Sequence, residues 1–304
     1  MIISVASGKG GTGKTTVAVG LALSLADKSA ERIQFIDCDV EEPNAFLFLK
    51  PEISHSSPVG LPIPKIDYSK CTFCGKCAEV CAYKAIAVVR NQVLLFPELC
   101  HGCGACTFFC PEKAVAEEEM EIGKIDEGSS GRIEFLQGRL NIGEPKATPL
   151  IRALKGRINP HGITIIDVPP GTSCQVIESV KGSDFSLLVT EPTPFGLNDL
   201  ILAVETIRKL RIPLGVIINR DGIGDNSIDE YCEKENIPIL MRIPMDRNIA
   251  IAYSKGIPVI QVNSHYKNRF HELYQKIFEL SKKDMTEKEL KEKLRLRTSK
   301  DEEV

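Results

Sequence analysis

The sequence lacks any apolar run close to the roughly 20 residues that a membrane-spanning helix needs, so we expect no membrane span. It also has little net charge, −3 from 38 basic and 41 acidic residues. The basic residues form no obvious cluster, which removes the electrostatic case for a nucleic-acid binder. The apolar stretch Met1–Ala6 leads directly into a glycine-rich loop, which indicates a core strand and not a signal peptide.

Cysteine, in contrast, is abundant, with eleven in 304 residues. Eight of the cysteines stand at metal-ligand spacing, so the disulfides of a secreted protein do not explain them. Thiolate ligands indicate a reducing compartment, and we expect a cytoplasmic protein. The remaining composition, 43% hydrophobic and 26% charged, is typical of a globular protein, and the length suggests about two domains.

The most specific motif lies near the N-terminus. Gly8 is followed by four residues and then by Gly13-Lys14-Thr15, which is the P-loop pattern, between an apolar strand stretch and an apolar helix stretch. The glycines let backbone N–H groups face the β- and γ-phosphates at the positive end of the helix dipole. Lys14 adds a positive charge there, and the Thr15 hydroxyl ligates Mg²⁺. The predicted ATP-binding residues are Gly8, Lys9, Gly10, Gly11, Thr12, Gly13, Lys14, Thr15 and Thr16.

Lys9 departs from the ordinary P-loop, which needs no second lysine directly after its first glycine. With it, the segment Gly8–Thr16 resembles the deviant P-loop of the MinD/ParA/Mrp ATPases and of the nitrogenase iron protein. The resemblance implies that two subunits enclose ATP and that Lys9 reaches across to the nucleotide of the other subunit. It therefore implies a dimer, of two copies or with a paralogue, and places Lys9 and Lys14 among the catalytic residues. An ordinary surface lysine is the alternative for Lys9.

Two acidic strand ends resemble the switch segments of the same family. In Asp37-x-Asp39, the resemblance makes Asp39 the catalytic residue that orients the water attacking the γ-phosphate. Asp167 ends a second buried strand and would bind Mg²⁺ through water, with Gly171 near the γ-phosphate. Thr15, Asp39 and Asp167 are thus the candidate Mg²⁺ ligands, directly or through water. A plain turn acid at a strand end is the alternative for Asp39.

The adenine pocket of the family also has counterparts in this sequence. Asn219 stands at the end of a predicted strand, and Pro244 and Asp246 follow another one. The resemblance assigns these three residues to the adenine base. Ordinary turn residues are the alternative at each position.

The eight cysteines repeat one spacing twice, as Cys71-x2-Cys74-x2-Cys77-x3-Cys81 and Cys100-x2-Cys103-x2-Cys106-x3-Cys110-Pro111. This is the pattern of bacterial two-cluster ferredoxins, in which the fourth cysteine of each run holds the other cluster. Structural zinc is the alternative, since CxxC pairs also bind zinc, but eight cysteines in tandem favour [4Fe–4S] clusters. His101 reads as a loop residue. The predicted ligand sets are Cys71, Cys74, Cys77 and Cys110 for one cluster, and Cys81, Cys100, Cys103 and Cys106 for the other.

Strand and helix patterns alternate along the rest of the chain, which predicts an α/β fold with a mostly parallel, doubly wound sheet of the P-loop NTPase type. The predicted organisation is a P-loop ATPase domain in two parts, 1–61 and 118–283, an inserted bacterial-type two-cluster [4Fe–4S] ferredoxin domain, 62–117, and a charged tail, 284–304.

Three segments around this framework carry further expectations. Four prolines within Pro51–Pro64 indicate irregular structure. The alternating stretches Glu117–Asp126 and Ile133–Ile142 predict a hairpin that ties the insert to the main sheet. The tail from Lys282 onward mixes both charges with few leucines, so we expect a solvated helix or a disordered end.

Taken together, the motifs favour a slow, partner-stimulated ATPase in which ATP-driven changes of a dimer gate electron transfer from two [4Fe–4S] clusters to a redox or metallocofactor-related partner. The first alternative is an Mrp-like ATPase that assembles or carries an iron–sulfur or other metal centre. The second is a redox-sensing positioning switch, which should need a membrane or DNA surface that the charge pattern does not favour. Cys174 lies where the nitrogenase iron protein has a cluster ligand, but we expect a buried, inert thiol.

Overall fold

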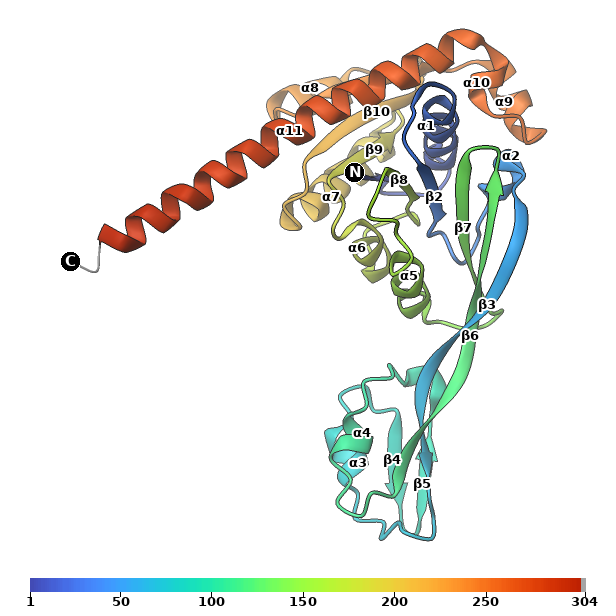
Figure 1. Cartoon of the computed structure of the whole chain (residues 1–304), viewed down its shortest axis with the longest axis vertical. Coiled ribbons are helices and arrows are strands. Elements are labelled where there is room, and N and C mark those ends of the chain that lie inside the picture. Colours follow the sequence, from blue (N-terminus) through green and yellow to red (C-terminus); the bar gives the residue numbers. More distant parts are fainter. Residues whose placement is uncertain (302–304) are drawn as a thin grey trace.

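The computed structural model describes residues 1–301, with side chains described as far as Lys282. This part of the chain forms a nine-stranded sheet of order β11-β10-β9-β1-β8-β2-β7-β6-β3 and a separate two-stranded sheet of β4 and β5 (Figure 1). The strands are β1 (Ile2–Ala6), β2 (Ile33–Asp37), β3 (Glu52–Ile66), β4 (Ile86–Val89), β5 (Gln92–Leu95), β6 (Val115–Ser130), β7 (Ile133–Leu140), β8 (Ile163–Asp167), β9 (Phe185–Thr190), β10 (Leu214–Asp221) and β11 (Ile239–Pro244).

Helices cover both faces of the large sheet. The helices of the described residues are α1 (Lys14–Lys28), α2 (Phe46–Leu49), α3 (Lys76–Val80), α4 (Ala105–Phe108), α5 (Ala147–Lys155), α6 (Cys174–Val180), α7 (Pro194–Lys209), α8 (Ser227–Lys234), α9 (Arg247–Ser254), α10 (Val259–Val262) and α11 (Ser264–Asp301), with a short 3-10 turn, η1 (Pro97–Leu99). Of these, α3, α4 and η1 lie away from the large sheet (Figure 1).

The large sheet is parallel from β11 through β7 and becomes antiparallel at β6 and β3. Its parallel strands are short apolar runs such as Ile163–Asp167, in which every residue is buried, as expected where helices cover both faces. Helices α1, α10 and α11 share one hydrophobic core with the sheet, and α5 to α8 share the other. The predicted α/β fold with a mostly parallel, doubly wound sheet is confirmed.

The segment Pro51–Pro64 is not irregular, as the prolines indicated, because most of it is the long strand β3. β3 lies at the edge of the sheet, so no strand pairs with its outer side. A proline whose nitrogen faces outward therefore loses no hydrogen bond between strands. Edge position therefore accommodates prolines that would disrupt a central strand. The predicted hairpin is present as β6 and β7, although β6 begins earlier and ends later than the pattern indicated.

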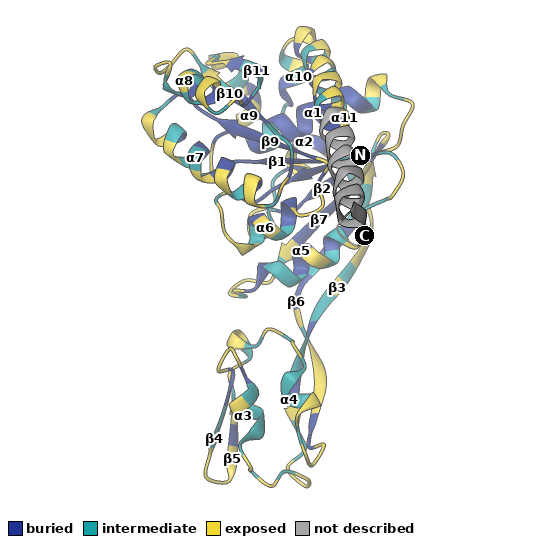
Figure 2. Ribbon diagram, turned by 90° about the vertical axis from the view of Figure 1, so that its left-hand side faces the viewer, coloured by how far each residue is buried: buried dark blue, intermediate teal, exposed yellow. Residues whose placement is uncertain are grey.

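β3 and β6 together carry a small cysteine-rich unit away from the sheet. They pair from Glu52 with Ser129 to Ile66 with Val115, whereas β7 pairs with β6 only from Gly123 onward. The remaining two-stranded part, residues 60–66 and 115–122, is called the ribbon below. The unit at its end, residues 67–114, contains α3, α4, η1 and the β4–β5 hairpin, and is called the cysteine module (Figures 1 and 2).

The body of the molecule and the cysteine module differ in how they are held together. The sheet and its helices contain continuous buried stretches, whereas most of the module is exposed or half-buried (Figure 2). A module with so little apolar core needs another source of stability, such as bound metal. No helix within the described residues is long and apolar enough to cross a membrane. The charged tail is helical as far as Asp301, as part of α11, whereas the expectation that it is solvated lies outside the described side chains.

The docking of α11 on α1 provides a test of the fold. Phe270 is fully buried, and a Cβ placed on Gly20 of α1 would lie 2.6 Å from its ring. We expect Phe270→Ala to lower the free energy of unfolding by about 3 to 5 kcal/mol, because it leaves a cavity between two helices. Phe278→Ala, at a site on the same helix that is 39% exposed, is the control and should cost about 1 kcal/mol or less. Equal losses in urea unfolding would contradict this packing.

Candidate functional site

The P-loop joins β1 to α1 through a turn that only glycine can form. Gly11 and Gly13 have left-handed backbone conformations, with φ of 76° and 95°. A Cβ on Gly13 would lie 2.3 Å from the Asn219 amide nitrogen, which itself donates a hydrogen bond of 2.8 Å to the carbonyl of Thr12. The loop is therefore held from outside by the end of β10, which fixes it before any ligand binds.

A pocket of about 1440 Å³, including space open to solvent, lies over this loop. The second half of the loop faces Pro170 of the β8–α6 connection and residues from the ends of β10 and β11. The predicted residues that line it are Gly10, Gly11, Gly13, Lys14, Thr15, Thr16, Asp39, Asn219, Pro244 and Asp246. The structure thus brings the predicted phosphate, water-orienting and adenine residues to one cavity. Gly8, Lys9, Thr12, Asp167 and Gly171 do not line it.

Sequence reasoning missed other residues that line this pocket. Arg220 directly follows the predicted Asn219, so extending that strand-end pattern by one residue would have found it. Tyr253 comes from α9, and its sequence surroundings give no comparable indication.

Three carboxylates converge at the carboxyl ends of two paired strands. Asp37 lies opposite Asp167 in the β2–β8 register. Asp37 is fully buried and accepts hydrogen bonds of 3.1 Å from the N–H groups of Asp39, Asn44 and Ala45. Burial, and then the charge of Asp167, raise the pKa of Asp37 well above its usual range. Its role is to shape the loop that presents Asp39, a role that the sequence did not reveal.

The electrostatics of the other two acids favour a cation. Burial raises the pKa of Asp167 to about 7, although the Thr15 hydroxyl and Lys14 counteract it. Burial also raises the pKa of Asp39 to about 6, against the opposite effect of Lys14. Within the described residues, neither carboxylate oxygen of Asp167 has a hydrogen-bond partner of standard geometry. A buried carboxylate without a partner is costly, so Asp167 and Thr15 fit a divalent cation such as Mg²⁺.

Lys9 is held within its own chain. Its ammonium lies 2.5 Å from a carboxylate oxygen of Glu191, whose other oxygen accepts a hydrogen bond of 2.7 Å from Arg220. Arg220 also donates to the carbonyl of Gly11, at 3.1 Å. Lys9 is therefore engaged by a carboxylate of its own chain that Arg220 also contacts. No sequence pattern around Glu191 indicated that it contacts Lys9.

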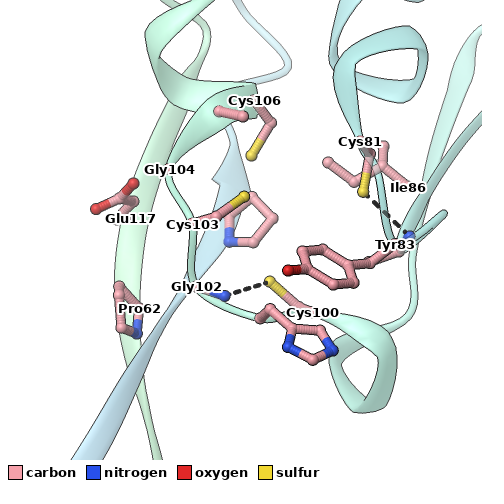
Figure 3. Close-up of a pocket in the computed structure, with 14 residues that line it drawn as sticks. Pro62, Cys81, Tyr83, Ile86, Cys100, Gly102, Cys103, Gly104, Cys106 and Glu117 are labelled. Atoms are coloured by element: carbon pink, nitrogen blue, oxygen red, sulfur yellow. Dashed lines mark hydrogen bonds between the residues drawn. The ribbon is translucent and has the colours of Figure 1, made fainter. Parts of the chain in front are cut away.

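The cysteines of the module surround two cavities. One, of about 400 Å³ including space open to solvent, is lined by Cys81 from the first cysteine run and by Cys100, Cys103 and Cys106 from the second (Figure 3). The other, of about 350 Å³ including space open to solvent, is lined by Cys71, Cys74, Cys77 and Cys110. We call Cys71, Cys74, Cys77 and Cys110 set A, and Cys81, Cys100, Cys103 and Cys106 set B. In each set, the fourth cysteine of one run joins the first three of the other.

The two halves of the module repeat the same local backbone. Cys81 and Cys110 each accept a hydrogen bond at sulfur from the N–H four residues later, Ala85 at 3.2 Å and Ala114 at 3.3 Å. The residue three positions after each of these cysteines has a left-handed backbone, with φ of 56° and 51°. Such N–H groups stabilise thiolate charge, so the sulfurs fit an anionic metal centre. His101 stacks on Tyr83 at 3.7 Å between ring centroids.

Cys174 is exposed at the start of α6, so the expectation of a buried thiol is wrong. It is the first residue of this short helix, whereas Val176 and Val180 of the same helix are buried in the hydrophobic core. The other cysteines outside the module, Cys38 and Cys232, are buried.

This fold and this loop define a P-loop nucleotide-binding protein of the α/β class. Residues 3–259 match the family described as "CobQ/CobB/MinD/ParA nucleotide binding domain", and the chain belongs to that family. The resemblance of its P-loop to MinD and ParA proteins is thereby confirmed at the level of the family.

Individual relatives agree with this assignment. The chain is 32% identical to an uncharacterized protein of Methanocaldococcus jannaschii over 86% of this chain and 93% of the relative. It is 24% identical to the iron-sulfur cluster carrier protein of Pyrococcus abyssi over 85% of this chain and 78% of that protein. The solved structure of the septum site-determining protein MinD of Pyrococcus horikoshii, complexed with Mg-ADP, matches with a TM-score of 0.57 at 20% identity, covering 93% and 98% of the two chains. This last likeness shows a shared fold.

The two lysines of the P-loop give a paired test. Lys14 is buried in the loop, so Lys14→Ala should weaken ATP binding by about 100-fold through loss of a charge-assisted contact. Lys9→Ala should bind ATP nearly as well as the wild type but lose ATP-dependent dimerisation and turnover. Nucleotide titration measures the first effect, and light scattering with Mg-ATP in an Asp39→Asn background measures the second. Normal dimerisation of Lys9→Ala would contradict the role implied by the family resemblance.

Proposed function

We propose that the protein is an ATPase that holds two [4Fe–4S] clusters in its cysteine module and acts in the assembly or delivery of iron–sulfur or related metal centres. The observation that carries the proposal is the pair of four-cysteine cavities inserted between the Asp39 and Asp167 segments of a P-loop chain. The relative from Pyrococcus abyssi, named an iron-sulfur cluster carrier protein, supports delivery over other uses of the clusters.

The cavities support clusters over zinc. A single zinc ion needs four sulfurs converging at about 2.3 Å from one point. Here each set of four cysteines lies around its own cavity, with glycines such as Gly102 and Gly104 in the loops of set B. Within the described residues, no three or more cysteine, histidine or carboxylate side chains are placed to hold a single metal ion. The eight cysteines in tandem and the N–H donors directed at sulfur suit two four-iron cubes, whose iron and sulfide atoms supply reversible one-electron chemistry when bound.

On the nucleotide side, Lys14 and the P-loop N–H groups bind the phosphates, and Thr15 with Asp167 would hold Mg²⁺, which neutralises phosphate charge. Asp39 orients the attacking water from the loop that Asp37 fixes. Gly171, whose N–H donates to the Ser7 carbonyl at 3.0 Å, places the β8–α6 loop beside the P-loop, near the γ-phosphate.

The adenine base and the second subunit complete this proposed nucleotide site. Asn219, Pro244 and Asp246 also line the pocket and receive the adenine. Lys9 acts across the interface of an ATP-bound dimer after it has left Glu191.

Electron transfer to a partner is the second candidate, and a specific observation favours it. All eight cysteines of the module are used by the two resident sites, which leaves Cys174 as the exposed cysteine outside them for a transferable cluster. Permanently held clusters at the end of a ribbon suit electron exchange with a docked protein. The two candidates therefore differ in whether iron leaves the protein.

Metal content tests the module itself. Protein purified without oxygen should contain about eight iron and eight sulfide per chain, as two cubes require. Cys103→Ser in set B and Cys74→Ser in set A should each lower both contents by about half, whereas Cys174→Ser should leave them unchanged. Metal and sulfide analysis gives the result directly. Stoichiometric zinc without sulfide would overturn the cluster assignment.

Transfer to an acceptor tests the function. Protein loaded with additional iron and sulfide should transfer a cluster to an apo-form [4Fe–4S] enzyme in the presence of Mg-ATP and restore its activity, while about eight iron stay bound. Lys14→Ala should transfer at least about tenfold more slowly. If no iron moves but ATP, compared with ADP, changes the rate at which the reduced clusters reduce a redox dye, electron transfer replaces delivery as the function.

A further inference from the structure

The cysteine module touches the body of the molecule through a buried lysine. Lys146, the residue just before α5, has a side chain only 6% exposed. Its ammonium donates a hydrogen bond of 2.9 Å to the carbonyl of Pro97 in the module, and lies 3.0 Å from the carboxylate of Glu144 in its own loop. A buried ammonium with a carboxylate on one side and a carbonyl on the other is a directional, charge-assisted link.

The acceptor of this bond is also part of a cysteine loop. Pro97 begins the 3-10 turn that leads into set B, and its carbonyl accepts a second hydrogen bond, of 3.0 Å, from the N–H of Cys100. The same loop meets the ribbon, since a Cβ on Gly102 would lie 2.8 Å from the buried side chain of Leu61. Set B is therefore attached to the body, whereas the cavity of set A is lined by the far ends of the ribbon, Ile66 and Val115.

On its other side, Lys146 is joined to the helix that follows the Asp167 loop. α5 packs on α6 through paired hydrogen bonds of 3.2 Å from Arg152 to Glu178. Lys155 of α5 also donates to the backbone carbonyl of Glu178, at 2.6 Å. α6 begins at Cys174, seven residues after Asp167, so a movement of that loop carries α6 and α5 with it.

The Asp39 loop reaches the same region. The carbonyl of Val40 accepts a hydrogen bond of 2.9 Å from the N–H of Leu140, at the end of β7 and beside the base of the ribbon. Glu41 accepts a hydrogen bond of 2.7 Å from Gln175 of α6. Both loops that border the γ-phosphate position are thus joined, through short contacts, to the elements that carry Lys146.

We propose that Lys146 is a positioning residue that couples the nucleotide state of the ATPase to the conformation of the Cys100 loop, so that ATP and ADP act on set B and not on set A. This inference rests on the proposed nucleotide-controlled use of the cysteine module. Coupling requires an element that both sites bias. Here that element is α5 with its N-terminal loop, which contacts α6 at one end and Pro97 at the other.

The test compares backbone amide exchange in the iron-loaded protein with ADP and with a non-hydrolysable ATP analogue. Wild-type exchange in residues 97–106 should differ between the two nucleotides by about fivefold or more, the lower range of typical coupling. Exchange in residues 71–77, which contain three of the four cysteines of set A, should not differ. Lys146→Met, which keeps the side-chain length but removes the ammonium, should reduce the difference in 97–106 to less than about twofold with ATP hydrolysis unchanged.

Two further variants separate coupling from simple loss of packing. Lys146→Arg keeps a charged donor and should restore much of the difference. Lys65→Met removes a lysine of the ribbon that is 67% exposed and paired with Glu118, and should behave as the wild type. The inference would be overturned if amide exchange in residues 97–106 differed between the two nucleotides as much in Lys146→Met as in the wild type. It would also be overturned if exchange did not differ between the nucleotides in the wild type. Normal coupling in a protein that transfers no cluster would instead overturn the proposed function and leave this inference standing.

Discussion

The parallel pairing of β2 with β8 is the constraint on which the rest of the structure depends. Its register places Asp37 opposite Asp167, and β1 on the other side of β8 brings the P-loop to the same edge. A slip of one residue would turn these acids to the opposite face of the sheet. Because all three strands are buried on both faces, such a slip would also expose or misplace their apolar side chains. The hydrophobic core thereby fixes the geometry of the polar site.

The same strand connects that site to the cysteine module. β2 has β8 on one side and β7 on the other, and β7 pairs with β6, which continues into the ribbon. The loop after β2 therefore lies between the nucleotide pocket and the base of the insert, where Val40 accepts the hydrogen bond of Leu140. The cysteine module lies between Asp39 and Asp167 in the sequence, and its ribbon continues from β6, which pairs with β7 beside β2. The proposed coupling between nucleotide and module therefore has a continuous route through the sheet.

Two lysines illustrate how burial decides which contacts can change. Lys9 is 32% exposed, and its partner Glu191 also binds Arg220, so Glu191 keeps a positive partner when Lys9 departs. If Lys9 leaves Glu191, as the proposed dimer requires, the buried Glu191 carboxylate therefore still has Arg220 as a partner. Lys146 is 6% exposed, and separation from Glu144 and Pro97 would leave its buried ammonium without these two partners. Lys9 is suited to change partners, whereas Lys146 is suited to move together with the groups it holds.

The sequence by itself determined the features that depend on local chemistry. The Gly8–Thr15 spacing, the alternation of apolar strands and helices, and the tandem cysteine runs each reflect a requirement of a short segment. They predicted the α/β sheet, part of the lining of the nucleotide pocket and the grouping of the eight cysteines around two cavities. Only the tertiary structure decided the rest. Prolines could remain in β3 because it became an edge strand. Glu191 pairs with Lys9, and Lys146 with Pro97, across 182 and 49 residues of sequence. Such contacts leave no local sequence pattern, because a long-range polar contact requires only that folding bring two ordinary groups together.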